Sequence, residues 1–225
     1  MSMKRISVLL AEDHTIVREG FRKMLELEDD LEVVGEAQDG RQAVAMIKKL
    51  RPDVVLMDIA MPLLNGLEAT RQVLKVLPTT KVLILSAHSD DEYVLHATKF
   101  GAVGFLLKQT SAHDVCRAIR EVDQGKTVFS PAISKHFDRL NPQWPGHAGV
   151  HNFSQLTSRE MEVLQLIAEG KANKETAAEL GISIKTIEKH REHLMAKLDI
   201  HDTAGLTRYA ISAGVIESSV QLTIV

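Results

Sequence analysis

Several features that would define a protein class are missing from this 225-residue sequence. It has a single cysteine, Cys116, which rules out an internal disulfide framework and is consistent with a reducing cytosol. The apolar run at residues 6–10 is far too short to cross a membrane and charges soon follow it, so we expect a cytoplasmic protein with no membrane association. The net charge of −3 gives no overall attraction to nucleic acid, so any DNA binding must come from a local surface.

The first half of the chain alternates between two patterns. Short runs rich in Val, Ile and Leu, typical of strands buried on both faces, cover residues 6–13, 31–37, 53–58, 81–87 and 104–108. Segments with the apolar spacing of amphipathic helices lie between them. This alternation predicts an α/β fold with a doubly wound, five-stranded parallel sheet. The flavodoxin-like strand order 2-1-3-4-5 would suit it.

The pattern changes after about residue 123, where Pro and Gly become frequent. From residue 156 onward only helical spacing remains, with four short helices and a two-residue joint before Ser183. That arrangement predicts an all-α helix-turn-helix domain. We therefore expect an α/β domain at 1–123, a linker at 124–152, a helical domain at 153–217 and a tail at 218–225.

Polar side chains end four of the predicted strands. They are Glu12 and Asp13, Asp58, Ser86 and Lys108. The carboxyl ends of parallel strands form one edge of the sheet, so these side chains should converge there. Three crowded carboxylates raise one another's pKa, and Mg²⁺ is a cation that relieves such repulsion. A carboxylate held in this way can attack phosphorus and become an aspartyl phosphate, with a lysine and a hydroxyl contacting the phosphoryl oxygens.

Each of these residues also has a simpler interpretation. Asp13 could only cap the first helix, Asp58 could only cap the turn that follows its strand, and Lys108 could be a solvated strand end. Their occurrence together at four strand ends favours the functional interpretation.

The segments "LLAEDH", "VVLMDIAMPLLNG", "LILSAH" and "GAVGFLLK" resemble the receiver domain of bacterial two-component response regulators. The resemblance implies that Asp58 is the phosphoacceptor and that Glu12, Asp13, Asp58 and the carbonyl of Ala60 hold Mg²⁺. Ser86 and Lys108 would contact the phosphoryl group. The loop after Asp58 would need Gly66 for close backbone approach.

The resemblance also implies a switch. In this family the Ser86 position and an aromatic near the fifth strand relay phosphorylation, and Phe105 stands where that aromatic is expected. The ring would rotate inward as the Ser86 hydroxyl turns toward the phosphoryl group. The alternative is that Phe105 is a permanently buried core aromatic.

Residues 155–216 resemble the LuxR-type helix-turn-helix domain through "LTSRE", "EGKANKE", "ELGIS" and "KTIEKHR". Together with the receiver, this identifies the NarL/FixJ class of response regulator. The second helix of such a motif, here 183–198, enters the major groove of DNA. We assign Lys185, Thr186, His190 and Lys197 mainly to phosphate positioning, and Lys189, Glu188 and Glu192 to base edges.

The helical domain is not positively charged overall. Residues 150–216 contain eight Lys or Arg and nine Asp or Glu, so a monomer should bind DNA weakly and in a salt-sensitive way. A homodimer would supply a second half-site and avidity. The last helix is the predicted dimer surface, through Leu206, Tyr209, Ala210 and Ala213, although the same residues could simply pack in the core.

We interpret the chain as a transcription factor, not an enzyme, that is switched by phosphorylation of Asp58 and binds double-stranded DNA as a dimer. A sensor histidine kinase would be the phosphodonor, and RNA polymerase is a candidate partner. Two rival interpretations are a phosphotransfer or phosphatase enzyme using the same acids, and a regulator whose helical domain binds protein instead of DNA.

Overall fold

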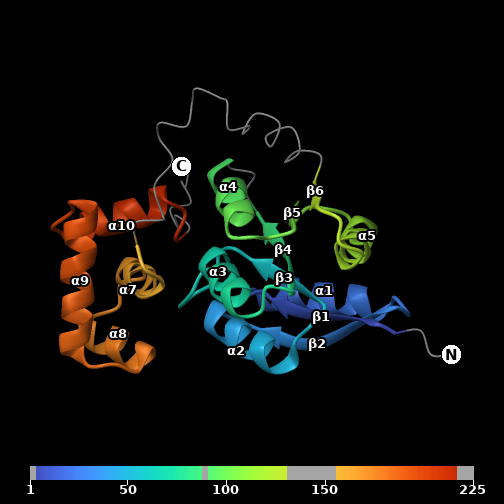
Figure 1. The fold of residues 1–225 in the computed structure, drawn as a ribbon, viewed down its shortest axis with the longest axis horizontal. Coiled ribbons are helices and arrows are strands. Elements are labelled where there is room, and N and C mark those ends of the chain that lie inside the picture. Colours follow the sequence, from blue (N-terminus) through green and yellow to red (C-terminus); the bar gives the residue numbers. More distant parts are fainter. Residues whose placement is uncertain (1–3, 88–90, 131–155, 217–225) are drawn as a thin grey trace, which may run out of the picture. The chain divides into compact units, whose positions relative to one another are not determined.

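A computed structural model describes residues 4–87, 91–130 and 156–216 of the chain (Figure 1). The chain divides into two compact units, residues 1–148 and 149–225. The first unit is α/β and the second is helical, as the sequence predicts. Across the described ranges, no helix combines the length and the apolar character needed to cross a membrane.

A parallel sheet forms the centre of the first unit. Its strands are β1 (Ile6–Ala11), β2 (Leu31–Ala37), β3 (Val54–Asp58), β4 (Lys81–Ser86), β5 (Gly104–Leu107) and β6 (Val128–Phe129). They lie in the order β2-β1-β3-β4-β5-β6, and every neighbouring pair is parallel. The predicted order 2-1-3-4-5 is therefore confirmed.

The sheet has one strand more than predicted. β6 pairs with β5 through Gly104–Val128 and Phe105–Phe129, inside the segment that we expected to be linker. A strand of two residues is too short to show an alternating pattern, which explains why the sequence did not reveal it. The first unit thus extends beyond residue 123, and most of the predicted linker lies outside the described residues, as does the predicted tail.

Helices cover both faces of the sheet (Figure 1). They are α1 (Thr15–Glu26), α2 (Gly40–Leu50), α3 (Gly66–Val76), α4 (Asp91–Lys99) and α5 (Ala112–Asp123). Successive strand residues point to opposite faces. Leu9 accordingly joins the core shared with α2, α3 and α4, whereas Leu10 joins the core shared with α1 and α5. Because apolar side chains cover both faces of the sheet, the polar side chains of the strands lie at or near the strand ends.

The second unit contains α7 (Ser158–Ala168), α8 (Asn173–Leu180), α9 (Ile184–Leu198) and α10 (Thr203–Ser212). α7 begins with a capping box between Thr157 and Glu160. The side chain of Ser183 accepts a hydrogen bond from the Thr186 amide at the start of α9, and Asp202 caps α10 in the same way. α8 ends at Gly181, whose φ of 64° is readily adopted only by glycine. The short turn between α8 and α9 completes a helix-turn-helix.

The predicted dimer surface on α10 needs correction. Leu206, Ala210 and Ala213 are buried in the helical unit itself, where α10 packs against α7, and Tyr209 is half-buried. The helical spacing that suggested an interface reflects core packing, which was the stated alternative. Any partner contact through α10 must use its outer side, where Ile211 is exposed.

Candidate functional site

The strand-end residues meet at the carboxyl edge of the sheet. Glu12 follows β1, Asp58 is the last residue of β3, and Lys108 follows β5. Glu12 and Asp58 are 2% and 1% exposed, so both carboxyl groups are withdrawn from water. Asp13 is half-buried beside them. The predicted convergence of the three acids is therefore present.

Lys108 is the cation of this group. Its Nζ lies 2.8 Å from Glu12 Oε2 and 3.0 Å from Asp58 Oδ2. Burial alone would lower the pKa of Lys108, but the charges of Asp58 and Glu12 outweigh it and raise that pKa. Lys108 stays charged, and the interpretation as a solvated strand end is wrong.

The carboxyl group of Asp58 has an altered acidity. Burial, and next the charge of Glu12, raise its pKa to about 6, against the opposing effect of Lys108. Burial is the largest cause of this rise, and the expected repulsion by neighbouring acids contributes to it through the charges of Glu12 and Asp13. A carboxylate of raised basicity that lies beside a fixed cation is well suited to act as a nucleophile.

Neither aspartate is the N-cap of the helix that follows it. The N-cap of α1 is His14 rather than Asp13. The N-cap of α3 is Asn65, whose side chain accepts a hydrogen bond from the Glu68 amide. Neither acid is therefore explained by a helix end.

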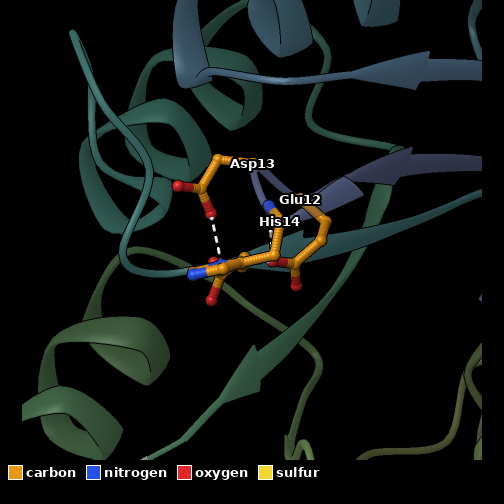
Figure 2. A group of neighbouring side chains, drawn as sticks. Glu12, Asp13 and His14 are labelled. Carbon is orange, nitrogen blue, oxygen red and sulfur yellow. Dashed lines mark hydrogen bonds and ion pairs between the residues drawn. The ribbon is translucent and has the colours of Figure 1, made fainter. Parts of the chain in front are cut away.

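His14 belongs to the same cluster, and we did not expect it there. Its Nδ1 lies 2.9 Å from Asp13 Oδ1 and 3.1 Å from Glu12 Oε1, as Figure 2 shows. Its backbone N–H also donates to Glu12 Oε1, at 3.1 Å. The charge of Asp13, and next the hydrogen bond to Glu12, raise the pKa of His14. Its position directly after the acid pair was the only signal in the sequence.

Arg18 holds the segment that carries the acid pair. This buried side chain donates through Nη1 to the carbonyl oxygens of Glu12, at 2.8 Å, and Asp13, at 3.3 Å. Its Nε also lies 3.3 Å from Glu36 Oε2. Arg18 was not expected to contribute either, because nothing in the sequence except its position in the helix after the acid pair connects it with the site.

The loop between β3 and α3 closes tightly over Asp58. A Cβ on Gly66 would lie 1.9 Å from the carbonyl oxygen of Asp58, so only glycine fits. The amide of Gly66 donates to the carbonyl of Ile59, at 2.9 Å. The expected close approach at Gly66 is confirmed, and Ala60 lies half-buried in this loop.

The donor set fits a hard divalent cation. Glu12, Asp13, His14 and Asp58 each offer one ligand atom, and these atoms lie within 4.8 Å of one another. Within the described part of the chain, three buried oxygens of these acids, Glu12 Oε2, Asp13 Oδ1 and Asp58 Oδ2, accept no well-aligned hydrogen bond and are held only by ion pairs with Lys108 and His14. Clustered carboxylate oxygens are the ligands that Mg²⁺ prefers.

The two residues of the predicted switch are both buried in the sheet. Ser86 is buried at the end of β4, and its carbonyl accepts a hydrogen bond from the Lys108 amide, at 2.8 Å. Phe105 is 0% exposed and belongs to the core between the sheet and α2, α3 and α4. An inward ring agrees both with a permanently buried core aromatic and with the inward state of the predicted switch, so the switch role of Phe105 stays a prediction.

The exposed side of α9 carries the residues predicted to contact DNA. Lys185, Glu188, Lys189 and Glu192 are exposed, and Thr186 and His190 are half-exposed. A hollow of about 390 Å³ runs beside the helix. It is lined by Asn173, Glu188, Arg191, Glu192, Met195, Ala196 and His201.

Two basic residues of α9 have partners inside the unit. Arg191 donates to Asn173 Oδ1, at 3.0 Å, and to Thr203 Oγ1, at 3.2 Å, and so joins the beginnings of α8 and α10 to α9. Lys197 Nζ lies 2.7 Å from Glu160 Oε2. Lys197, which we assigned to phosphate positioning, thus already has a buried carboxylate as its partner.

The chain matches two known families. Residues 8–120 match the response regulator receiver domain, and residues 154–210 match the bacterial regulatory proteins of the luxR family. It is 38% identical over 213 residues to the response regulator protein VraR of Staphylococcus aureus, covering 94% of this chain and 99% of VraR. It is 37% identical over 211 residues to the transcriptional regulatory protein DegU of Brevibacillus brevis, covering 88% and 89%.

Solved structures give the same result. RcsB of Salmonella typhimurium superposes with a TM-score of 0.58 at 28% identity, over 93% of this chain and 100% of that one. A complex of the two-component response regulator RcsB with DNA matches with a TM-score of 0.58 at 27% identity, over 93% and 99%.

Proposed function

This chain belongs to the NarL/FixJ class of two-component response regulators, and from that premise we propose that it is a transcription factor switched by phosphorylation of Asp58. The main support for this proposal is the buried Asp58 carboxylate. Its Oδ2 lies 3.0 Å from Lys108 Nζ, and two further acids lie beside it. A sensor histidine kinase would supply the phosphoryl group. The protein would act on DNA in the cytoplasm.

The chemistry follows from the strand-end geometry. An Asp58 oxygen forms a bond to phosphorus while the bond from phosphorus to the donor's leaving group breaks, giving an aspartyl phosphate. Mg²⁺ held by Glu12, Asp13, Asp58 and the Ala60 carbonyl would offset the charge of the carboxylates and of the phosphoryl oxygens. Lys108 keeps a positive charge next to Asp58, and Ser86 would donate its hydroxyl to the phosphoryl group.

The helical unit would bind double-stranded DNA through α9. Its exposed side carries Lys185 and Lys189, which DNA phosphates attract, together with Glu188 and Glu192, which phosphates repel. The relative RcsB has been solved as dimers bound to DNA. We extend this to the present chain as a homodimer on paired half-sites, in which the outer side of α10, with Ile211 and Arg208, meets its copy.

Labelling tests the phosphoacceptor. The full chain is incubated with Mg²⁺ and acetyl phosphate, and the phosphorylated fraction is separated on a phosphate-binding gel. We expect labelling of the native chain and none of Asp58→Asn, while Asp53→Asn, a strand-end control at the opposite edge, labels normally. Equal labelling of Asp58→Asn would show that another residue accepts the phosphoryl group.

Selection from random-sequence DNA tests whether the chain binds a specific DNA sequence as a dimer. We expect the phosphorylated chain to enrich a two-fold symmetric site and the Asp58→Asn chain to bind it more weakly. Enrichment of no sequence would favour a helical unit that binds protein instead. Transcription with purified RNA polymerase from the selected site would then show whether the polymerase is a partner.

A further inference from the structure

We propose that His14 is a direct ligand of the cation at the acidic site, and that its imidazole makes this site favour a first-row transition cation over Mg²⁺. The inference rests on the proposed function in one respect, because it needs a cation held by Glu12, Asp13 and Asp58. It goes further by naming a nitrogen donor and the class of ion that this donor selects.

The position of the ring is the first reason. Nδ1 lies within 3.1 Å of an oxygen of Glu12 and within 2.9 Å of an oxygen of Asp13, so it faces both acids at once (Figure 2). The His14 nitrogen and one oxygen each from Glu12, Asp13 and Asp58 all lie within 4.8 Å of one another. The imidazole is therefore part of the donor group and not a neighbour of it.

The second reason is that the His14 side chain does not cap the helix that it begins. It occupies the N-cap of α1, where Ser, Thr, Asp or Asn would stabilise the helix by about 1 kcal/mol. Within the described part of the chain, the His14 side chain makes no capping hydrogen bond. Its backbone N–H and its ring are both directed to the acids instead. A helix-capping role thus does not account for a histidine at this position.

Ligand preference supplies the selectivity. Mg²⁺ takes oxygen ligands almost exclusively, whereas transition cations also accept imidazole nitrogen, increasingly from Mn²⁺ toward Cu²⁺. A site of three carboxylates alone serves either kind of ion. Adding a neutral imidazole strengthens the binding of the transition ion and offers Mg²⁺ little.

His14 could instead be only a counter-ion whose positive charge neutralises the acids. The two roles predict opposite results on removal of the ring. Loss of a counter-ion would strengthen the binding of every divalent cation alike. Loss of a ligand would weaken the transition ion selectively.

The experiment is calorimetric titration of the full chain with Mg²⁺ and with Mn²⁺, comparing native protein with His14→Asn. Mn²⁺ is the probe because it binds imidazole least strongly in the series, so the other histidines among the ten of the chain compete least. Asn is a good N-cap residue, so α1 should remain intact in the variant. His113→Asn, which removes an exposed histidine from α5, is the matched control.

We expect His14→Asn to lower the Mn²⁺ affinity by about tenfold or more, a loss no smaller than that caused by removing an outer-shell partner. Its Mg²⁺ affinity should stay the same or rise. Pulsed electron paramagnetic resonance of bound Mn²⁺ should show coupling to nitrogen in the native chain and in His113→Asn, and none in His14→Asn.

Two results would overturn the inference while leaving the proposed function in place. One is an equal change in affinity for both ions in His14→Asn, and the other is the absence of nitrogen coupling in the native chain. Asp13→Asn distinguishes a failure of the His14 assignment from a failure of the cation site itself. If that variant binds both ions as well as the native chain, the acidic cation site itself is wrong, and the cation part of the proposed function fails with it.

Discussion

Lys108 Nζ lies 3.0 Å from Asp58 Oδ2 and 2.8 Å from Glu12 Oε2, so a half-buried ammonium group at the end of β5 bridges the carboxylates at the ends of β1 and β3. The three residues come from segments 46 to 96 positions apart in the chain, which only the parallel sheet brings together. Breaking this bridge leaves the two buried carboxylates of Glu12 and Asp58 without their cation.

Lys108→Gln should therefore destabilise the first unit by about 3 kcal/mol at pH 7, because removing one partner of a buried ion pair leaves the other charge uncompensated. Denaturation of the full chain by urea, without divalent cations, measures the loss. Lys4→Gln is the control, since Lys4 pairs with Asp53 at 3.1 Å but is largely exposed, and its removal should change little. Similar losses for the two variants would mean that the buried bridge contributes no more than a surface pair.

Asp58→Asn should act in the opposite direction. The rise of the Asp58 pKa from 3.8 to about 6 means that folding opposes ionisation of this group, by up to about 3 kcal/mol at neutral pH. The neutral amide removes that cost, so the variant should be more stable than the native chain at pH 7 without divalent cations. Thermal unfolding in a chelating buffer is the measurement.

The pH dependence of this gain has a definite sign. The cost of ionised Asp58 is complete above its folded pKa of about 6 and absent below its unfolded value of 3.8. The stability advantage of Asp58→Asn should therefore shrink as the pH falls from 7 to 4. Asp53→Asn is an opposite control, because hydrogen bonds from Ser7 outweigh burial and lower the pKa of Asp53, so this variant should lose stability at pH 7. An advantage of Asp58→Asn that does not change with pH would contradict the raised pKa.

The strand-end site could be predicted because one rule governs it. Parallel strands place their last residues at a common edge, so Glu12, Asp58 and Lys108 could be assigned without knowing any distance. His14 escaped prediction because its ring turns back toward the preceding residues instead of capping α1. The direction of a side chain at a helix start is a tertiary property that sequence spacing does not contain.

The helical unit shows a different limit. Apolar spacing on α10 indicated a buried face correctly, but it could not tell a core from a dimer interface, and Leu206 belongs to the core. Lys197 has the spacing of a solvent-facing residue, yet it reaches Glu160 on α7, a residue 37 positions earlier. A long, flexible side chain can cross between helices in a way that a helical projection does not show.

Lys197→Met should accordingly destabilise the helical unit more than it weakens phosphate contact. Glu160 is buried, and its pKa is lowered because the hydrogen bonds from Lys197 and Thr157 outweigh burial. We expect a lower unfolding temperature with the slope of log affinity against log salt unchanged. Lys189→Met, on the exposed side of α9, should keep the unfolding temperature and reduce that slope by about 0.9, the value for one lost phosphate contact. If Lys197→Met reduces the slope and leaves stability intact, its first assignment to DNA is right.

Glu188 tests whether the acidic side chains of α9 take part in choosing sequence. This exposed glutamate borders the hollow beside α9, together with Glu192, on the surface proposed to meet DNA. A carboxylate there repels phosphates, and it contributes favourably only where a cytosine amino group can donate to it. Glu188→Ala should therefore raise the affinity for random DNA and narrow the gap between selected and random sites, by about 1–3 kcal/mol for one base contact. Gel-shift titrations against both DNAs measure the gap.

Glu179→Ala supplies the comparison, because it removes the same charge from the exposed side of α8 rather than α9. A purely electrostatic effect would raise the affinity for selected and for random DNA equally in both variants. The difference in affinity between the two DNAs would then stay unchanged in each variant. A base-reading effect appears only in Glu188→Ala and only as a narrower gap. If both gaps stay the same, Glu188 lies on a solvated face, and the sequence preference of α9 must come from its lysines and from the second half-site.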